Sequence, residues 1–215
     1  MSSTDQRAQF EAMFRADPDP WKFKERWYEA RKRALTLACL TRPRYESAFE
    51  PGCANGELSA ALAERCDRLL ISDGAPAALE LARSRVAASP NVSTLLGWMP
   101  EAWPAGDFDL IVVSELAYFL TPEAIDALGD RARKSLRAGG DVVGCHWRHP
   151  IDGYELDGDA AHARFGAAVR LPLVWSLIEP DFRISIWSAE TSTVAQRDGL
   201  VPQPNPGSNL SSVTG

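Results

Sequence analysis

The sequence predicts an α/β fold in which a doubly wound, mostly parallel seven-stranded sheet carries a C-terminal antiparallel hairpin and an N-terminal helical cap. Three observations lead to this prediction. The length of 215 residues, 45% of them hydrophobic, suits one domain with an appendage. Five short apolar runs alternate with helical segments between residues 46 and 147, as βαβ crossovers require. Two further strand-like runs then follow each other directly.

The N-terminal segment, residues 1–45, is expected to form the cap. Residues 8–15 have the spacing of a short amphipathic helix, and the Asp-Pro-Asp-Pro sequence at 17–20 ends it, because each proline disfavours helix at the preceding residue. Helical periodicity resumes from Trp21 to about Leu40. Residues 1–45 contain ten Lys or Arg against six Asp or Glu, although the whole chain has a net charge of −6.

The core elements are predicted in order along the chain. Strands are expected at 47–50, 68–72, 92–96, 109–114 and 141–146, with helices at 56–65, 76–88 and 121–136. The fourth strand, Asp109–Ser114, is apolar enough for burial on both faces, as in a parallel sheet. Thr121 followed by Pro122 is a favourable helix start, and Gly139-Gly140 is expected to end that helix.

The remaining elements complete the domain at 46–190. A helix is predicted at 157–169, and strands at 173–179 and 182–187 are expected to pair as an antiparallel hairpin at the sheet edge. Residues 191–215 are expected to be a disordered tail, because the last fifteen residues carry no charge and are rich in Pro, Gly and Ser.

Composition excludes several classes of function. An acidic chain offers no general basic face for nucleic acid. The longest uncharged apolar run, 171–178, is too short to cross a membrane, and the N-terminus has no signal-peptide core. The four cysteines form no CxxC pair, so we expect reduced thiols and no metal site. A cytoplasmic protein without nucleic-acid or membrane partners is expected, and its oligomeric state is left open.

The chemically informative segment follows the first strand. The sequence Glu-Pro-Gly-Cys-Ala-Asn-Gly at 50–56 has small residues where an open α/β sheet binds ligands, and a helix N-terminus follows. Asp73 ends the second strand 21 residues after Gly52, at a position that suits a carboxylate accepting both hydroxyls of a ribose. The pattern predicts an adenosine-binding site, and the absence of GxGxxG disfavours an NAD-dependent oxidoreductase.

Glu-x-Gly-x-Ala-x-Gly, followed by an acid at the end of the second strand, resembles motifs I and II of class I S-adenosylmethionine-dependent methyltransferases. The chain has Ala54 where the family usually has glycine. The segments 108–115, 118–120 and 136–140 resemble the family's fourth strand, post-strand segment and turn before the fifth strand. The resemblance covers residues 47–147 and implies a Rossmann-like fold, S-adenosyl-L-methionine as cofactor and methyl transfer as the activity.

A narrower resemblance is to the nodulation protein S-like branch. Its features are Asp-Pro-Asp-Pro-Trp at 17–21, Trp-Tyr-Glu at 27–29, Glu-Pro-Gly-Cys at 50–53 and Ser-Glu-x-x-Tyr at 114–118. The best-known members of this branch N-methylate an amino sugar. The resemblance therefore implies a small polar acceptor, with an amine nitrogen preferred over a hydroxyl.

The resemblance also implies a set of cofactor-binding residues. They are Trp21, Tyr28, Arg31, Glu50, Gly52, Cys53, Ala54, Gly56, Asp73, Gly74, Ala75, Trp98, Met99, Ser114 and Glu115. In this interpretation, the turn at 52–54 lies beneath the methionyl part, and Asp73 holds the ribose. Gly74 and Ala75 line the adenosine, and Trp98 and Met99 occupy the adenine edge. Ser114 and Glu115 face the sulfonium, and the N-terminal residues form a cover.

Methyl transfer needs alignment and exclusion of water, which contribute up to about 7–11 kcal/mol. An amine acceptor must also be neutral, so a carboxylate or imidazole is expected beside it. Glu115 and His146 are the catalytic candidates, and Tyr118, His146 and Trp147 are expected to bind the substrate.

Other interpretations of these residues, and other functions, are also consistent with the sequence. His146 is equally interpretable as a hydrogen-bonded core residue, and Tyr118 as packing. The alternative functions are a small-molecule O-methyltransferase, in which Glu115 or His146 takes a hydroxyl proton, and a non-catalytic protein that binds a nucleotide or S-adenosylmethionine.

Overall fold

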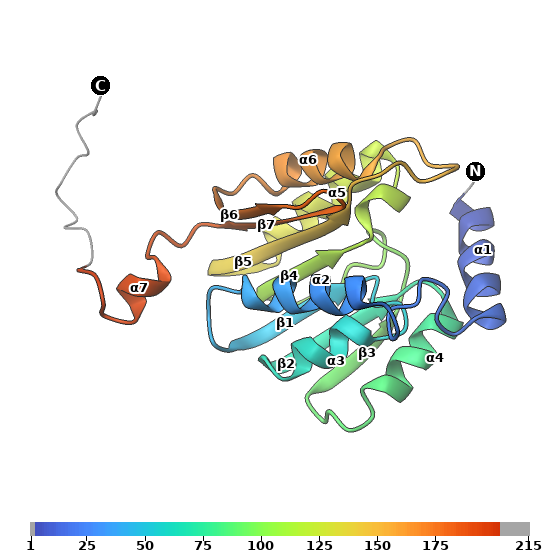
Figure 1. Cartoon of the computed structure of the whole chain (residues 1–215), viewed down its shortest axis with the longest axis horizontal. Helices are drawn as coiled ribbons and strands as arrows, with labels where there is room; N and C mark the ends of the chain where they lie inside the picture. Colours follow the sequence, from blue (N-terminus) through green and yellow to red (C-terminus); the bar gives the residue numbers. More distant parts are fainter. Residues whose placement is uncertain (1–2, 203–215) are drawn as a thin grey trace.

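A computed structural model describes residues 3–202, which form one seven-stranded sheet with helices on both faces (Figure 1). The strand order is β3-β2-β1-β4-β5-β7-β6. The strands are β1 Tyr45–Pro51, β2 Cys66–Asp73, β3 Val92–Leu96, β4 Phe108–Ser114, β5 Leu136–Trp147, β6 Leu173–Ile178 and β7 Phe182–Ser188. Strands β1 to β5 pair in parallel, whereas β7 pairs antiparallel to both β5 and β6. The predicted fold class is confirmed.

The sheet has its topological switch point between β1 and β4. The chain proceeds outward from β1 through β2 to β3, and then returns to place β4 and β5 on the other side of β1. In open α/β sheets, the crevice at the carboxyl ends of the strands beside such a point is the ligand site. The motif at residues 50–56 follows β1, so it lies at this ligand-binding edge of the sheet, as the sequence predicted.

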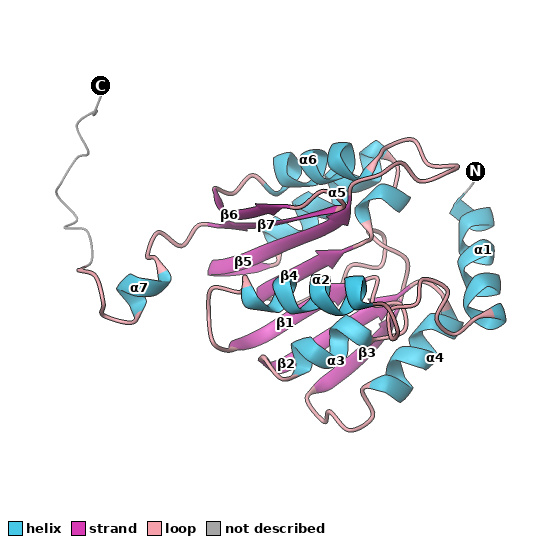
Figure 2. Cartoon of the chain, in the orientation of Figure 1, coloured by secondary structure: helices cyan, strands magenta, loops and turns pink. Residues whose placement is uncertain are grey.

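Helices cover both faces of this sheet (Figure 2). They are α1 Ser3–Ala16, α2 Trp27–Ala38, α3 Glu57–Ala63, α4 Pro76–Arg85, α5 Pro122–Lys134, α6 Gly158–Val169 and α7 Val194–Arg197, and a 3-10 turn spans Ala117–Phe119. One apolar cluster joins the sheet to α2, α3 and α4, and a second joins the opposite face to α5 and α6. Helix α1 lies beside α4 at the edge of the molecule (Figure 1).

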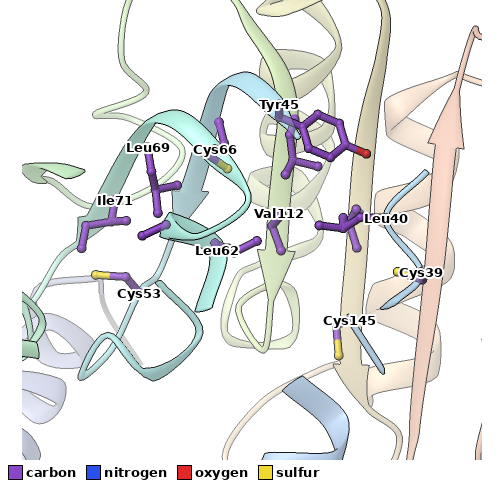
Figure 3. Close-up of a cluster of buried hydrophobic side chains, with 14 of the residues drawn as sticks. Cys39, Leu40, Tyr45, Cys53, Leu62, Cys66, Leu69, Ile71, Val112 and Cys145 are labelled. Carbon is purple, nitrogen blue, oxygen red and sulfur yellow. The ribbon is translucent and has the colours of Figure 1, made fainter. Parts of the chain in front are cut away.

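The cysteines belong to the first of these clusters (Figure 3). Cys39, Cys53, Cys66 and Cys145 are all free and buried. Within residues 3–202, no group of His, Cys, Asp or Glu is arranged to hold a metal ion. None of the helices described is both long and apolar enough to span a membrane.

Several predicted boundaries differ from the structure: α1, for example, begins at Ser3 rather than at residue 8, and α4 ends at Arg85 rather than at residue 88. Two other differences have a clear structural cause. The second helix begins at Trp27 rather than Trp21, because the Asp19 carboxylate accepts hydrogen bonds from the N–H groups of Phe23 (2.8 Å) and Lys24 (3.1 Å) and holds a turn there. The fifth strand begins at Leu136, before the Gly139-Gly140 pair that was expected to precede it. Leu136 already pairs with Phe108, and the ladder shifts register before Leu110, so the glycines lie within an irregular part of the strand.

The segment expected to be a tail also contains a helix. Thr193 and Gln196 form a capping box at the start of α7, and Arg197 donates a hydrogen bond of 2.7 Å to the Thr41 carbonyl. This capping pattern is readable from the sequence and was missed. The remainder of the predicted tail, 203–215, lies outside the described residues.

Candidate active site

A cavity of about 710 Å³ lies at the carboxyl ends of β1, β2 and β4, and residues of α1 and α2 also line it. The sequence-predicted residues on its wall are Trp21, Tyr28, Glu50, Gly52, Cys53, Ala54, Asp73, Gly74, Trp98, Met99, Ser114, Glu115, Tyr118 and Trp147. The structure does not place Arg31, Gly56, Ala75 or His146 on the wall.

The turn after β1 forms the floor of the cavity. Gly52 has φ of +76°, a conformation that disfavours any residue with a Cβ, and Ala54 also has a positive φ of +49°. Gly56 has a different role from the one predicted. A Cβ on Gly56 would lie 2.9 Å from the Cα of Ala82, so this glycine permits α3 and α4 to pack closely.

Asp73 is fixed by the main chain on either side of the cavity floor. Its carboxylate accepts hydrogen bonds of 2.9 Å from the N–H groups of both Ala54 and Ala75. Burial raises the pKa of Asp73 to about 6, in spite of these hydrogen bonds, which lower it. Ala75 therefore contributes by orienting Asp73 and not by lining the cavity, which corrects its predicted role.

Glu50 presents an unpartnered oxygen at the end of β1. Its residue is 2% exposed, and within the described part of the chain its Oε2 has no hydrogen-bond partner. Burial raises the pKa of Glu50 to about 8. A buried polar atom without a partner costs about 1–3 kcal/mol. A ligand with a hydrogen-bond donor or an ammonium group would satisfy this oxygen.

Trp98 and Met99 form the wall beyond β3. A Cβ on Gly74 would lie only 2.2 Å from the Trp98 ring, so the glycine is required for the indole to lie against the end of β2. Phe10 packs on Trp98 with ring centroids 6.0 Å apart, and the Arg7 guanidinium lies 5.4 Å from the indole centroid. The α1 helix thus contacts the wall.

The N-terminal cover is aromatic and is held to the sheet domain by polar contacts. Phe10 and Trp21 both pack on Phe119, with centroids 5.1 and 6.4 Å apart. Gln6 donates a hydrogen bond of 2.6 Å to the Phe119 carbonyl, and Glu11 accepts one of 2.8 Å from the N–H of Ala77. The sequence predicted the helix but not its contribution to the wall.

Arg31 does not belong to this cover. Its guanidinium forms an ion pair of 2.7 Å with Glu179 and lies 5.9 Å from the centroid of the Phe182 ring. The side chain therefore joins α2 to the hairpin. Residues three positions apart on a helix are surface neighbours, as Tyr28 and Arg31 are, but only Tyr28 lines the cavity.

A cluster of charged groups lines the cavity where α2 meets the segment after β4. Lys32 Nζ lies 2.9 Å from Glu115 Oε1 and 3.0 Å from Glu29 Oε2. Glu115 Oε2 accepts hydrogen bonds from the Tyr118 hydroxyl and, at 3.1 Å, from the N–H of Trp147. Burial would raise the pKa of Glu115, but the Lys32 charge and the Tyr118 hydroxyl outweigh it and hold that pKa below its usual range.

His146 is a core residue in the structure. It is fully buried, and its Nδ1 lies 2.9 Å from Nδ1 of His162, whose Nε2 lies 2.9 Å from the Ser185 hydroxyl. Burial lowers the pKa of His146 to about 4. Its ring packs against Tyr118, which does line the cavity. The predicted catalytic and substrate contacts of His146 are therefore not present, because β5 turns this side chain toward α6.

Comparison with known proteins agrees with the fold. The model of the methyltransferase domain family matches residues 48–140. A crystal structure from Pseudomonas syringae, assigned as a methyltransferase, is 47% identical, and the match covers 76% of this chain and 99% of that one with a TM-score of 0.68. The chain belongs to the class I S-adenosylmethionine-dependent methyltransferases.

The methyltransferase is also similar to nodulation protein S. The Rhizobium tropici protein is 32% identical over 131 residues, which are 60% of this chain and 55% of the relative. The chain thus spans about half the length of the curated relatives it matches. The structure of N-methyltransferase NodS from Bradyrhizobium japonicum with S-adenosyl-L-homocysteine is 24% identical. It covers 86% of this chain and 98% of that one with a TM-score of 0.76, which shows a shared fold.

Sequence reasoning missed the charged residues that α2 contributes to this methyltransferase. Glu29 and Lys32 are 8% and 6% exposed and both line the cavity. Charged side chains are rarely buried unless they are paired, and a basic helix is ordinarily solvated. The available signal was that Lys32, four positions after the predicted cavity residue Tyr28 and three after Glu29, shares a helix face with each of them.

Proposed function

We propose that this methyltransferase transfers the methyl group of S-adenosyl-L-methionine to a small polar acceptor, with an amine nitrogen as the methylated atom. One observation carries the proposal: the segment that matches the cofactor motif and a buried acidic cluster line one and the same cavity. Asp73 ends β2 and Glu115 follows β4, and β1 lies between these strands.

The residues around the motif fit the cofactor. Asp73 offers carboxylate oxygens to the ribose hydroxyls, and Trp98 and Met99 offer an apolar surface to the adenine. Glu50 Oε2, which has no hydrogen-bond partner among residues 3–202, is an acceptor suited to the ammonium of the methionyl part. When bound, the cofactor supplies an electrophilic methyl group on a sulfonium. The chain's own residues bind and orient it.

The N-terminal cover serves the reaction by excluding water. Phe10, Trp21 and Phe119 shield the cavity with ring faces and edges, so that polar groups inside it interact in a low-dielectric environment. Alignment within such a site contributes up to about 7–11 kcal/mol to catalysis. Because residues of α1 and α2 line the cavity, we include the N-terminal cap in the catalytic unit.

The acidic cluster supports an amine acceptor. Two carboxylates share the single ammonium of Lys32, so this part of the cavity has an excess of negative charge that attracts a cationic group. Tyr118 and Trp147 lie on the same wall and would contact the acceptor.

We also place the reaction in the cytoplasm, a proposal supported by the four free cysteines.

Cofactor titration and product analysis test this function. Isothermal titration should show binding of S-adenosyl-L-homocysteine and none of NAD. Incubation with S-adenosyl-L-methionine and a panel of glucosamine, ethanolamine and hydroxylated analogues without nitrogen should give mass-shifted products only from the amines. Methylation of the hydroxyl compounds would establish an O-methyltransferase instead. Binding without any transfer would establish a non-catalytic cofactor-binding protein.

A further inference from the structure

The charged cluster of Glu29, Lys32 and Glu115 has more negative than positive charge. The side chains are only 10%, 8% and 17% exposed. Taking ions out of water is costly unless each is paired, and here one ammonium serves two carboxylates. A second cation in this part of the cavity would complete the pairing. The cluster is therefore built to receive a positively charged group.

The two carboxylates differ in how many hydrogen bonds they already accept. Glu115 receives three, from Lys32 Nζ, the Tyr118 hydroxyl and the N–H of Trp147. Lys32 Nζ, at 3.0 and 3.3 Å, is the only group in the described part of the chain seen to donate to Glu29. Glu29 thus retains acceptor capacity that Glu115 has used.

A second open hydrogen-bonding position lies on Tyr28, whose ring is near Lys32. The hydroxyl of Tyr28 is buried, and among the residues described it has no hydrogen-bond partner. The Tyr28 ring lies 5.0 Å from Lys32 Nζ and packs on Trp147 with centroids 5.7 Å apart. Tyr28, Glu29 and Trp147 all line the cavity. Unused polar capacity on neighbouring groups marks a place for a polar ligand.

We propose that Glu29 takes a proton from the acceptor ammonium before methyl transfer, with Lys32 as the positioning residue between Glu29 and Glu115. This inference rests on the proposed function. The ammonium N–H bond breaks and the proton forms an O–H bond on Glu29, which leaves a neutral amine. The amine lone pair then forms the N–C bond as the C–S bond breaks with its electron pair on sulfur. Glu29 returns its proton to water when the methylated ammonium leaves.

The electrostatics of the cluster agree with this division of roles. Burial raises the pKa of Glu29, and the Lys32 charge only partly offsets that effect, so Glu29 accepts a proton more readily than an ordinary glutamate. The pKa of Glu115 is instead lowered, so it stays ionised. The titratable and charged groups that act on Glu29 are Tyr28, Lys32 and Arg33 of α2, together with Glu115 and Tyr118 after β4.

The first test compares Glu29→Gln with Glu25→Gln, which removes the same charge from an exposed position on the same segment. With the best amine of the panel, Glu29→Gln should lower kcat/KM near pH 7 by about 100-fold or more, as loss of a general base does. The deficit should shrink as pH rises and solvent deprotonates the amine. Glu29→Asp should restore part of the rate, and Glu25→Gln should match the wild type.

The second test needs no acceptor. Sinefungin carries an ammonium where S-adenosyl-L-methionine carries its methylsulfonium, so its affinity relative to S-adenosyl-L-homocysteine reports the charge facing that position. This affinity ratio should fall about tenfold in Glu29→Gln and remain unchanged in Glu25→Gln. An unchanged ratio together with an unchanged pH profile would overturn the role of Glu29. Failure of the wild type to bind S-adenosyl-L-homocysteine would instead overturn the proposed function itself.

Discussion

Lys32 of α2 and Glu115 at the end of β4 form a largely buried ion pair, with Nζ 2.9 Å from Oε1. The pair joins the N-terminal cap to the sheet, because residues 83 positions apart in the sequence meet at the cavity wall. Glu115 adopts a positive φ of 56°, an uncommon conformation for a residue with a Cβ. The ion pair and the Tyr118 and Trp147 hydrogen bonds hold the carboxylate in place.

Replacing Lys32 should destabilise the fold as well as the site. In Lys32→Met, Glu29 and Glu115 lose their shared cation, and we expect the free energy of unfolding to fall by about 3–5 kcal/mol. Urea denaturation measures this change. Lys134→Met, which breaks an exposed pair with Asp130, should cost less than about 1 kcal/mol. Equal losses in the two variants would contradict the importance of the buried pair.

Replacing Asp73 should weaken cofactor binding. Asp73→Asn retains the size of the side chain but removes its charge, and loss of the ribose hydrogen bonds should cost about 1–3 kcal/mol of binding free energy. Isothermal titration with S-adenosyl-L-homocysteine measures the affinity. Asp67→Asn, at the exposed opposite end of β2, is the matched control and should bind normally. Unchanged affinity in Asp73→Asn would remove the ribose assignment.

Glu50 should make the ligand-free protein less stable at alkaline pH. Its folded pKa of about 8 lies above the ordinary value of 4.5, so the folded state binds the proton more tightly than the unfolded state. The contribution of Glu50 to stability is therefore present at low pH and is lost as pH rises from about 4.5 to 8. Thermal unfolding measured at a series of pH values between 4.5 and 8 gives the change of Tm with pH.

The corresponding variant makes this prediction specific. Glu50→Gln should have a higher Tm than the wild type at pH 8, and this difference should disappear near pH 4.5. It should also bind S-adenosyl-L-homocysteine more weakly, because the amide lacks the charge that pairs with an ammonium. Glu46→Gln, an exposed position on the same strand, should show neither effect. If Tm changes with pH to the same extent in the wild type and in Glu50→Gln, the raised pKa of Glu50 is refuted.

His146 should matter for stability rather than for the reaction. Its folded pKa of about 4 lies below the ordinary 6.5, so stability is lost as pH falls through this range, where the unfolded state takes up the proton first. His146→Gln should lower the Tm and leave the affinity for S-adenosyl-L-homocysteine within about twofold of the wild type. If the wild-type turnover rate falls at acidic pH and the rate of His146→Gln does not, His146 takes part in catalysis and this prediction is wrong.

The sequence was informative about the sheet and the cofactor motif because the signals there are local. Gly52, Ala54 and Asp73 belong to two strand ends whose order follows from the βαβ pattern, and parallel strands bring their carboxyl ends to one edge. Gly56 and Ala75 were placed in the right segments but with the wrong function. Whether a motif residue faces the ligand or packs against a helix depends on its neighbours, such as Ala82 of α4.

The sequence by itself determined the fold class, the position of the switch point and the Asp73 carboxylate at the cavity floor. Only the tertiary structure decided the arrangement of the charged cluster of Glu29, Lys32 and Glu115. Helix periodicity shows that Lys32 shares a face with Tyr28 and with Glu29, but not that this face packs over the end of β4. Likewise, alternation along β5 places His146 and Trp147 on opposite faces, and only packing against α6 showed which of them is in the core. Burial and pairing of charge are properties of the assembled layers, so no single segment specifies them.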